Sequence, residues 1–248
     1  MAEQFFLEVC AYNFQSCIIA EKAGANRVEL CDNHHEGGTT PSFGTIRLAR
    51  EKTSIQLYPI IRPRAGNFLY NDDEIAVMRN DIMMCKDLGC NGISVGVLLK
   101  NAEVDKDLLK RIVELAHPLK VTFHRAFDFT PDPIRAMEDI IEAGCERILT
   151  SGQEIVAVDG LDTIAKLVKA AGTRIKIMPG AGIRASNIER IIRKTGATEY
   201  HSSARHKMKN EGILRRSELM YLGHSYLTDA EEVKEIINIG NKTMKSRK

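Results

Sequence analysis

The sequence predicts one α/β domain in which eight parallel strands alternate with helices and close into a TIM (β/α)8 barrel. Its 248 residues are a common length for a single barrel of this kind. Short β-rich runs alternate with longer helical runs over most of the chain. Four glycines that follow predicted helices, Gly24, Gly89, Gly144 and Gly196, are 65, 55 and 52 residues apart. Each interval holds about two strand–helix units, so four repeats give eight. An open doubly wound sheet is the alternative, but no G-x-G-x-x-G fingerprint follows the first strand.

The predicted strands are short runs of β-forming residues bounded by turn residues. They cover residues 5–10, 27–31, 56–61, 92–97, 120–124, 147–150, 174–178 and 198–201. Seven of the eight are followed by a connection long enough to cross over to a parallel neighbour. This alternation is the main reason to expect a barrel with an outer layer of helices.

Predicted helix starts are marked by capping residues. Asn71 with Glu74 resembles a capping box, and apolar residues spaced three and four apart follow it. Ser186 with Glu189, and Thr228 with Glu231, show the same pattern. The other predicted starts are the caps Asn13 and Asp105, Pro131 at the first helical position after Thr130, and a helix over 159–171. The four repeated glycines suit the left-handed position that ends a helix.

The chain is predicted to divide at residue 205. Residues 1–205 form the barrel domain, and residues 206–248 form a C-terminal extension whose final helix packs on the barrel as its eighth helix. The extension starts with a basic stretch that includes Lys207, Lys209, Arg215 and Arg216. We interpret this stretch as a solvated loop; an arm that binds phosphate or RNA is the alternative.

Charge and composition exclude several classes of protein. With 35 basic and 33 acidic side chains, the net charge is +2, which argues against a nucleic-acid-binding or membrane-surface protein. No apolar run approaches the roughly 20 residues that span a bilayer. The N-terminus lacks the pattern of a signal peptide. The six cysteines are therefore expected to be free thiols in a reducing cytoplasm, and no C-x-x-C pair predicts a structural zinc site.

The first two strands each end in an E-x-C pattern. Because side chains alternate across a strand, Glu8 and Cys10 should point into the barrel together, and so should Glu29 and Cys31. Adjacent strands lie about 4.8 Å apart, so the two sulfurs can approach each other. Two neighbouring thiolates suit Cu(I). The alternatives are that both cysteines are small buried apolar residues, or that they oxidise to a disulfide.

Strands three and five are followed by further ionisable residues. His124 at the barrel mouth can act as a general acid or base, and Asp128 can orient it. A core histidine bonded to a backbone carbonyl is the other interpretation. Arg62, beside Pro63, offers a fixed fork for a carboxylate or phosphate, or it pairs with Glu29.

The later strand ends suggest an anion site. Glycine-rich turns after strands seven and eight are where barrels often bind phosphate through backbone N–H groups, although turn geometry alone would also explain the glycines. The candidate anion-binding residues are Arg64, Ser151, Gly180, Gly182 and Ser202. The long loop 32–42, with His34 and His35, should overhang the mouth as a lid or binding loop.

Six blocks of sequence, in order, strongly resemble the CutC family, which is named for copper homeostasis. They cover residues 8–10, 27–31, 37–42, 61–64, 122–128 and 149–152, within a similarity that extends over about 5–205. The resemblance implies a cytosolic TIM barrel, a homodimer or larger homo-oligomer, and Cu(I) binding at Cys10 and Cys31. It also implies a polar mouth that includes Ser151 and His201. Ser94 and Ala181 depart from the expected pattern.

Two functional hypotheses follow from the residues and the resemblance. The first is a copper homeostasis protein that binds Cu(I) through Cys10 and Cys31, with the copper ion as its partner. The second is an enzyme of hydrolase, lyase or isomerase type that acts on a small anionic or phosphorylated metabolite. The candidate catalytic residues of the second are Glu8, Glu29, Arg62, His124, Asp128 and His201. The acidic pair could also hold a divalent cation.

Overall fold

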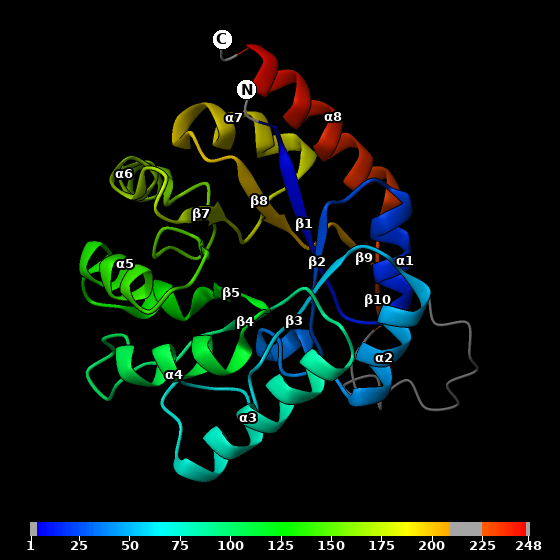
Figure 1. Cartoon of the computed structure of the whole chain (residues 1–248). Coiled ribbons are helices and arrows are strands. Elements are labelled where there is room, and N and C mark those ends of the chain that lie inside the picture. Colours follow the sequence, from blue (N-terminus) through cyan, green and yellow to red (C-terminus); the bar gives the residue numbers. More distant parts are fainter. Residues whose placement is uncertain (1–3, 209–224, 247–248) are drawn as a thin grey trace, which may run out of the picture.

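The computed structural model describes residues 4–208 and 225–246 and has the predicted barrel architecture (Figure 1). Its parallel strands form two four-stranded ladders, in the orders β3-β2-β1-β8 and β4-β5-β6-β7. A parallel bridge between Ile60 and Ser94 joins β3 to β4, and β7 lies beside β8. The strands are β1 (Phe6–Ala11), β2 (Arg27–Leu30), β3 (Gln56–Pro59), β4 (Gly92–Val95), β5 (Lys120–Phe123), β6 (Arg147–Thr150), β7 (Lys176–Pro179) and β8 (Glu199–Ser202).

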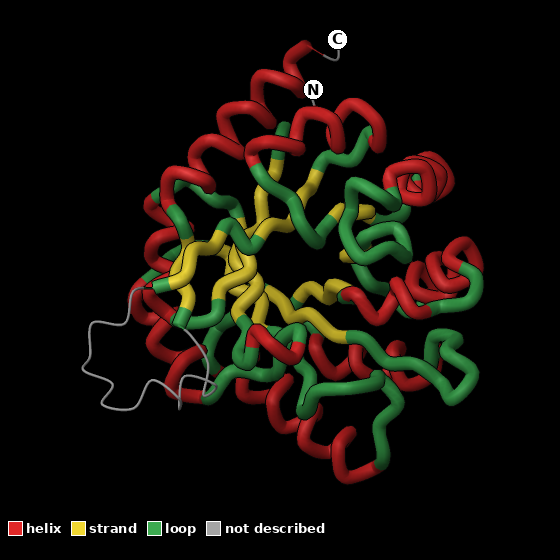
Figure 2. The backbone as a smooth tube through the Cα atoms, turned by 180° about the vertical axis from the view of Figure 1, so that it is seen from behind, coloured by secondary structure: helices red, strands yellow, loops and turns green. Residues whose placement is uncertain are grey.

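Helices surround the ring of strands (Figure 2). They are α1 (Phe14–Lys22), α2 (Phe43–Lys52), α3 (Asp72–Asp87), α4 (Lys106–Ala116), α5 (Pro133–Glu142), α6 (Leu161–Ala171), α7 (Ala185–Thr195) and α8 (Ala230–Ser246). The predicted capping box at α3 is confirmed, because Asn71 Oδ1 accepts from the Glu74 N–H and Glu74 Oε2 accepts from the Asn71 N–H, both at 2.9 Å. The four repeated glycines have φ between +71° and +95°, as a left-handed helix end requires.

Four predicted helix starts were wrong by one or two residues, and one of them is α6, which begins at Leu161 and not at residue 159. Helix α5 has proline at its first position, but it is Pro133 after the cap Asp132, and not Pro131. Helix α8 is capped by Asp229, whose Oδ1 accepts from the N–H groups of residues 231 and 232, and not by Thr228. In both cases an aspartate with a short acceptor side chain stands next to the predicted cap and takes its role.

At α7 the predicted pair Ser186 and Glu189 lies inside the helix. The helix begins one residue earlier than Ser186, and Asn187 Oδ1 accepts from the Arg184 N–H at 2.9 Å. The S-x-x-E pattern therefore coincides with the first turn but does not cap it.

The barrel has two apolar layers that follow the alternation of side chains along each strand. Leu7, Val9 and Leu30 belong to the large core between strands and helices. Cys10 and Cys31, together with Ile60, form a separate small cluster inside the barrel. The predicted inward orientation of both cysteines is therefore confirmed.

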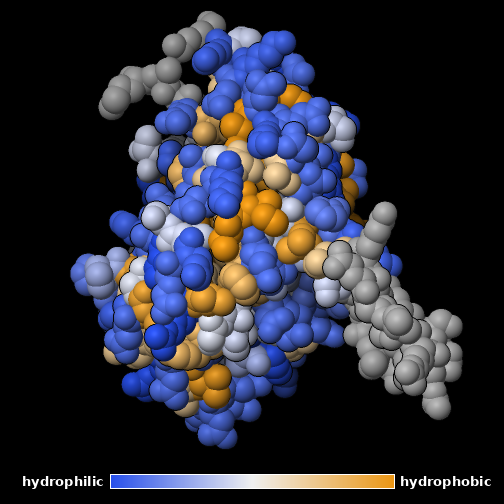
Figure 3. Space-filling model, turned by 90° about the vertical axis from the view of Figure 1, so that its right-hand side faces the viewer, coloured by the Kyte–Doolittle hydropathy of each residue, from blue (hydrophilic) through white to orange (hydrophobic). Residues whose placement is uncertain are grey.

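The C-terminal segment adds two elements that sequence reasoning missed. Strand β9 (Arg205–Lys207) pairs antiparallel with β10 (Tyr226–Thr228) before α8 packs against α7 and α1. The basic residues Lys209, Arg215 and Arg216 lie outside the described residues. The face of the molecule shown in Figure 3 is mostly hydrophilic, with hydrophobic side chains exposed mainly in its central part. Among the described residues, no helix is both long enough and apolar enough to cross a bilayer.

Candidate functional site

A cavity of about 790 Å³ opens at the carboxyl ends of the strands. This is the end at which (β/α)8 barrels carry their binding residues. The lining includes six of the predicted site residues: Cys10, Glu29, Arg62, His124, Gly182 and His201. Within the described residues, Glu8 and Cys31 lie next to these side chains but are not part of the cavity wall.

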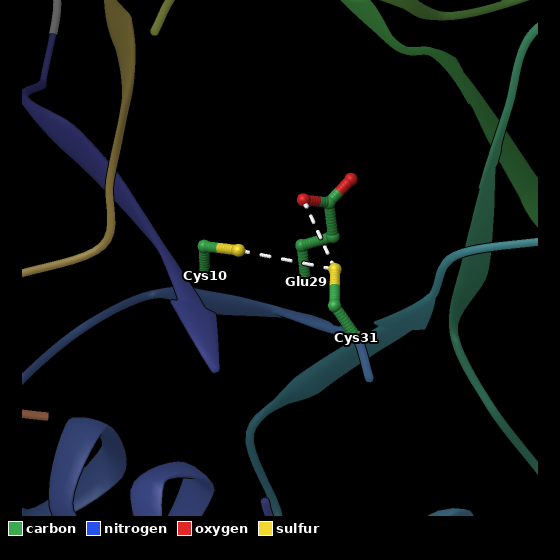
Figure 4. A group of neighbouring side chains, drawn as sticks. All are labelled: Cys10, Glu29 and Cys31. Carbon is green, nitrogen blue, oxygen red and sulfur yellow. Dashed lines mark hydrogen bonds between the residues drawn. The ribbon is translucent and has the colours of Figure 1, made fainter. Parts of the chain in front are cut away.

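The two cysteines and one carboxylate form a compact buried group in the mouth of the barrel (Figure 4). Cys10 Sγ lies 3.8 Å from Cys31 Sγ, and Cys31 Sγ lies 3.6 Å from Glu29 Oε2. The strand register causes this approach, because Cys10 on β1 is paired with Glu29 on β2. Cys31 is two residues beyond Glu29 and therefore points to the same side.

His201 connects this group to Glu8. Its Nδ1 lies 2.7 Å from Glu8 Oε1, and its Nε2 lies 3.7 Å from Glu29 Oε2. The β1–β8 register explains the contact, because Glu8 and His201 are partners across the two strands. Burial opposes protonation, but the Cys10 sulfur and the Glu8 carboxylate outweigh it and hold the pKa of His201 well above 6.5. His201 is therefore an imidazolium at neutral pH.

The protonation states of the two thiols differ. The hydrogen bond from Cys31 and the positive charge of His201 lower the pKa of Cys10 well below its usual 9.0. The hydrogen bond to Cys10, together with burial, raises the pKa of Cys31. Burial also raises the pKa of Glu29 to about 8. These shifts favour a thiolate at Cys10 beside an imidazolium at His201, and they favour the protonated forms of Cys31 and Glu29.

An ionic network lies deeper in the barrel, and sequence reasoning missed most of it. Arg27 binds Glu8 through its Nε and lies 2.8 Å from Glu199 Oε2 through its Nη2. Arg147 Nε lies 2.7 Å from the same Glu199 oxygen, and Arg147 Nη1 lies 2.6 Å from Glu146. The sequence could have predicted one member of this network. Arg27 is two residues before Glu29 on the same strand, so its side chain points to the same inward face.

Arg62 does not have the partners that the sequence suggested. Its Nη1 donates to the carbonyls of Glu36 and Gly38, at 2.6 and 2.7 Å, and its Nη2 donates to the carbonyl of Gly66 at 2.9 Å. Neither an anion fork nor a pair with Glu29 is formed. The fork is instead occupied by backbone carbonyls, so Arg62 fastens the loop after β2 to the loop after β3.

Asp128 does not orient His124. Its carboxylate accepts from Arg125 Nε at 2.8 Å, from Ser151 Oγ at 2.9 Å and from the Ser151 N–H at 3.1 Å. The His124 ring is held by its own loop, since its Nδ1 accepts from the Ala126 N–H at 3.1 Å. Asp128 and Ser151 therefore stabilise the turn after β6, where Asp128 accepts from the N–H groups of residues 151 and 153.

The predicted anion-binding residues do not converge. Arg64 forms an ion pair with Glu74 at 2.5 Å. Ser202 Oγ donates to the Ile183 carbonyl at 2.7 Å, and a side chain at Gly180 would collide with Leu149. Of the five candidates, Gly182 is the one that lines the cavity.

A family model and several known proteins match most of this chain. The CutC family model matches residues 5–206. The chain belongs to the CutC family. A CutC protein from Parabacteroides distasonis is 48% identical over 239 residues, which are 93% of this chain and 98% of that protein. The human copper homeostasis protein cutC homolog is 42% identical over 224 residues, 90% of this chain and 82% of that protein.

A solved structure of a CutC protein from Streptococcus agalactiae has the same fold. It is 34% identical, with a TM-score of 0.77, and the match covers 81% of this chain and 99% of that one. The barrel described above is therefore a CutC barrel, in a family that is named for copper homeostasis.

Proposed function

We propose that this CutC barrel binds Cu(I) through Cys10 and Cys31 and thereby serves copper homeostasis in the cytoplasm. The observation that carries the proposal is the separation of 3.8 Å between the two buried sulfurs. A metal–thiolate bond is about 2.3 Å long for zinc, so one ion can reach both sulfurs at such a separation. Thiolates are the ligands that select Cu(I).

The charges around the thiols support a monovalent soft ion. Binding requires Cys31 to lose its proton, while Cys10 is already a thiolate. Two thiolates with one Cu(I) carry a single negative charge, and the neighbouring imidazolium of His201 balances it. A buried charge needs such a partner, so the site is matched to one monovalent cation between two sulfurs.

The route to the ion is the cavity. Cys10 lines it, whereas Cys31 lies behind and is 2% exposed. An incoming ion therefore meets Cys10 first, as the reactive thiolate, and Cys31 second. A cytoplasmic location fits this chemistry, because all six cysteines of the chain are free and a reducing compartment keeps them so.

The test is competition for Cu(I) against a chelator under reducing conditions. The double variant Cys10→Ser/Cys31→Ser should lose tight binding. The matched control is Cys85→Ser/Cys90→Ser, which changes two other buried, interacting cysteines away from the cavity and should bind as the wild type does. Equal affinity in the wild type and the first variant would reject the site.

The second candidate is an enzyme that acts on a small anionic metabolite. The arrangement of three side chains favours it, because the Glu8 carboxylate orients the His201 imidazolium, which lies beside the Cys10 thiolate. A nucleophilic cysteine is activated in this way. His124 is not the base in this scheme, since burial and the charge of Arg62 lower its pKa to about 3. A metabolite screen should find turnover, and His201→Ala should abolish it. If the screen finds no turnover, copper binding stays as the sole candidate function.

A further inference from the structure

One buried donor in the cavity wall has no partner. His124 is 4% exposed and lines the cavity, yet its Nε2 makes no hydrogen bond to any described residue. The ring is held firmly in place. Its Nδ1 accepts from the Ala126 N–H at 3.1 Å, and the Phe68 ring packs at 5.2 Å. A side chain at Gly96 would collide with it, so a glycine makes room for this imidazole.

The unpartnered atom is a donor. Since Nδ1 accepts a hydrogen bond, the proton of the neutral ring lies on Nε2. Burial, and then the charge of Arg62, lower the pKa of His124 to about 3, so the ring is neutral at neutral pH. Buried donors in proteins are nearly always paired, and an exception inside a cavity points to a ligand that supplies the acceptor.

The other buried polar atoms without a hydrogen bond have polar neighbours inside the protein. Among the described residues these atoms are Arg62 Nε, Tyr70 Oη and Ser94 Oγ. The Tyr70 hydroxyl interacts with Arg62, and Ser94 interacts with Glu29. For His124 Nε2 no side-chain partner is found among the described residues, and His124 lines the cavity.

The charge of the cavity wall favours an anion. Arg62, Lys100 and Arg205 line it, and none of them forms an ion pair with a carboxylate of the described residues. The guanidinium of Arg62 is bonded to carbonyls, which leave its charge unbalanced. The two acidic residues in the wall are Glu29 and Glu36, so these three cationic side chains outnumber them.

Several apolar side chains also line the cavity. Phe68, which packs against the His124 ring, and Leu98 line the cavity. Leu99 and Phe129 also line it, with 42% and 65% of their surface exposed. Large apolar side chains that remain exposed beside a cavity are typical of a binding site for an organic molecule. A bare inorganic anion would leave these surfaces uncovered.

We propose that the mouth holds a second site, beside the thiols, for a small organic acid. One carboxylate oxygen accepts the hydrogen bond of His124 Nε2, and the apolar body of the ligand lies against Phe68 and Leu98. The inference does not depend on copper binding, because it uses neither cysteine.

The test uses benzoate as the probe acid and benzamide as its neutral counterpart, titrated into the full chain and followed by NMR. Benzoate should cause saturable shifts at residues around the cavity, and benzamide should bind at least about tenfold more weakly. His124→Phe keeps a ring but removes the donor, and it should weaken benzoate binding by about tenfold or more. His206→Phe makes the same change at an exposed histidine outside the cavity and should have no effect.

Three outcomes would overturn the proposal: no saturable shift with benzoate, equal binding of benzamide, or unchanged affinity in His124→Phe. If His124→Phe does not fold, the side-chain Nε2–H signal of wild-type His124 decides the question. Benzoate should shift it strongly downfield, and an unchanged signal at saturation would reject the contact.

Discussion

Two layers of buried polar and charged side chains lie in the same barrel. They differ in how many of these side chains have a hydrogen-bond or ion-pair partner within the protein. In the lower layer, Arg27 and Arg147 share Glu199, and Arg27 also binds Glu8. Each charge there has an opposite charge in contact. In the upper layer, His124 Nε2 has no partner in the described chain and Cys10 is a thiolate that faces a cavity. The protein itself pairs the charges of the lower layer, whereas the upper layer lies beside the cavity in which we propose that ligands bind.

Glu8 connects the two layers. One of its oxygens binds Arg27 below, and the other lies 2.7 Å from His201 Nδ1 above. The lower layer thus fixes the position of the imidazolium that stabilises the Cys10 thiolate. This difference teaches that buried charge alone does not mark a site, since a fully paired network is structural and unsatisfied groups beside an opening indicate binding.

The largest expected effect comes from breaking the lower layer. Arg27→Met keeps the volume but leaves Glu8 and Glu199 buried with less positive charge, which should lower the free energy of unfolding by about 3–5 kcal/mol. Urea denaturation measures it. Arg174→Met breaks an exposed pair with Glu138 and should change stability little. A similarly small loss for both variants would show that the lower network is not structural.

A smaller effect is expected in the pH dependence of stability, where His124 should contribute as a buried neutral group. Its folded pKa, about 3, lies below the usual 6.5, so the unfolded chain takes up a proton that the folded chain refuses. The resulting stability is fully present above pH 6.5 and is lost as pH falls toward 3. Between pH 8 and pH 5, the wild type should lose about 2 kcal/mol more than His124→Gln. Parallel pH profiles in urea denaturation would contradict a buried neutral imidazole.

The smallest effect is expected on metal affinity, where replacing the Glu29 carboxylate should matter less for Cu(I) than replacing the sulfur ligands. Glu29 lies 3.6 Å from Cys31 but offers oxygen, which Cu(I) disfavours. Glu29→Gln should therefore weaken Cu(I) binding by less than about tenfold and weaken Zn²⁺ binding by more. Competition titrations with both ions measure this, and Glu36→Gln, in the wall of the same cavity, is the control. A larger loss for Cu(I) than for Zn²⁺ would make Glu29 a copper ligand.

The predictions that rested on local pattern succeeded for most of the fold. The alternation of strands and helices gave the barrel, and the four glycines were placed at left-handed helix ends. Helix starts at α5, α6, α7 and α8 were missed by one or two residues. Several polar residues stand next to one another there, and the one whose side chain reaches the free N–H groups depends on the exact path of the chain.

For the site, the sequence predicted which side of each strand a residue faces, because side chains alternate along a strand. Parity placed Glu8, Cys10, Glu29 and Cys31 on one side of two adjacent strands, and the sulfurs lie 3.8 Å apart. It did not supply the partners of long side chains. Arg62 was free to reach an anion, Glu29 or a carbonyl, and the fold of the two loops beside it decided for the carbonyls.

The sequence by itself therefore determined the barrel, the inward face of each strand and the pair of thiols, because these follow from periodicity and chain direction within single elements. Only the tertiary structure decided which charges are paired and which remain open to a ligand. That outcome depends on side chains from strands far apart in the chain, such as Arg27 and Glu199, or on a loop that leaves one imidazole donor facing the cavity. Such contacts have no sequence period, since they are set by how the ring of strands closes.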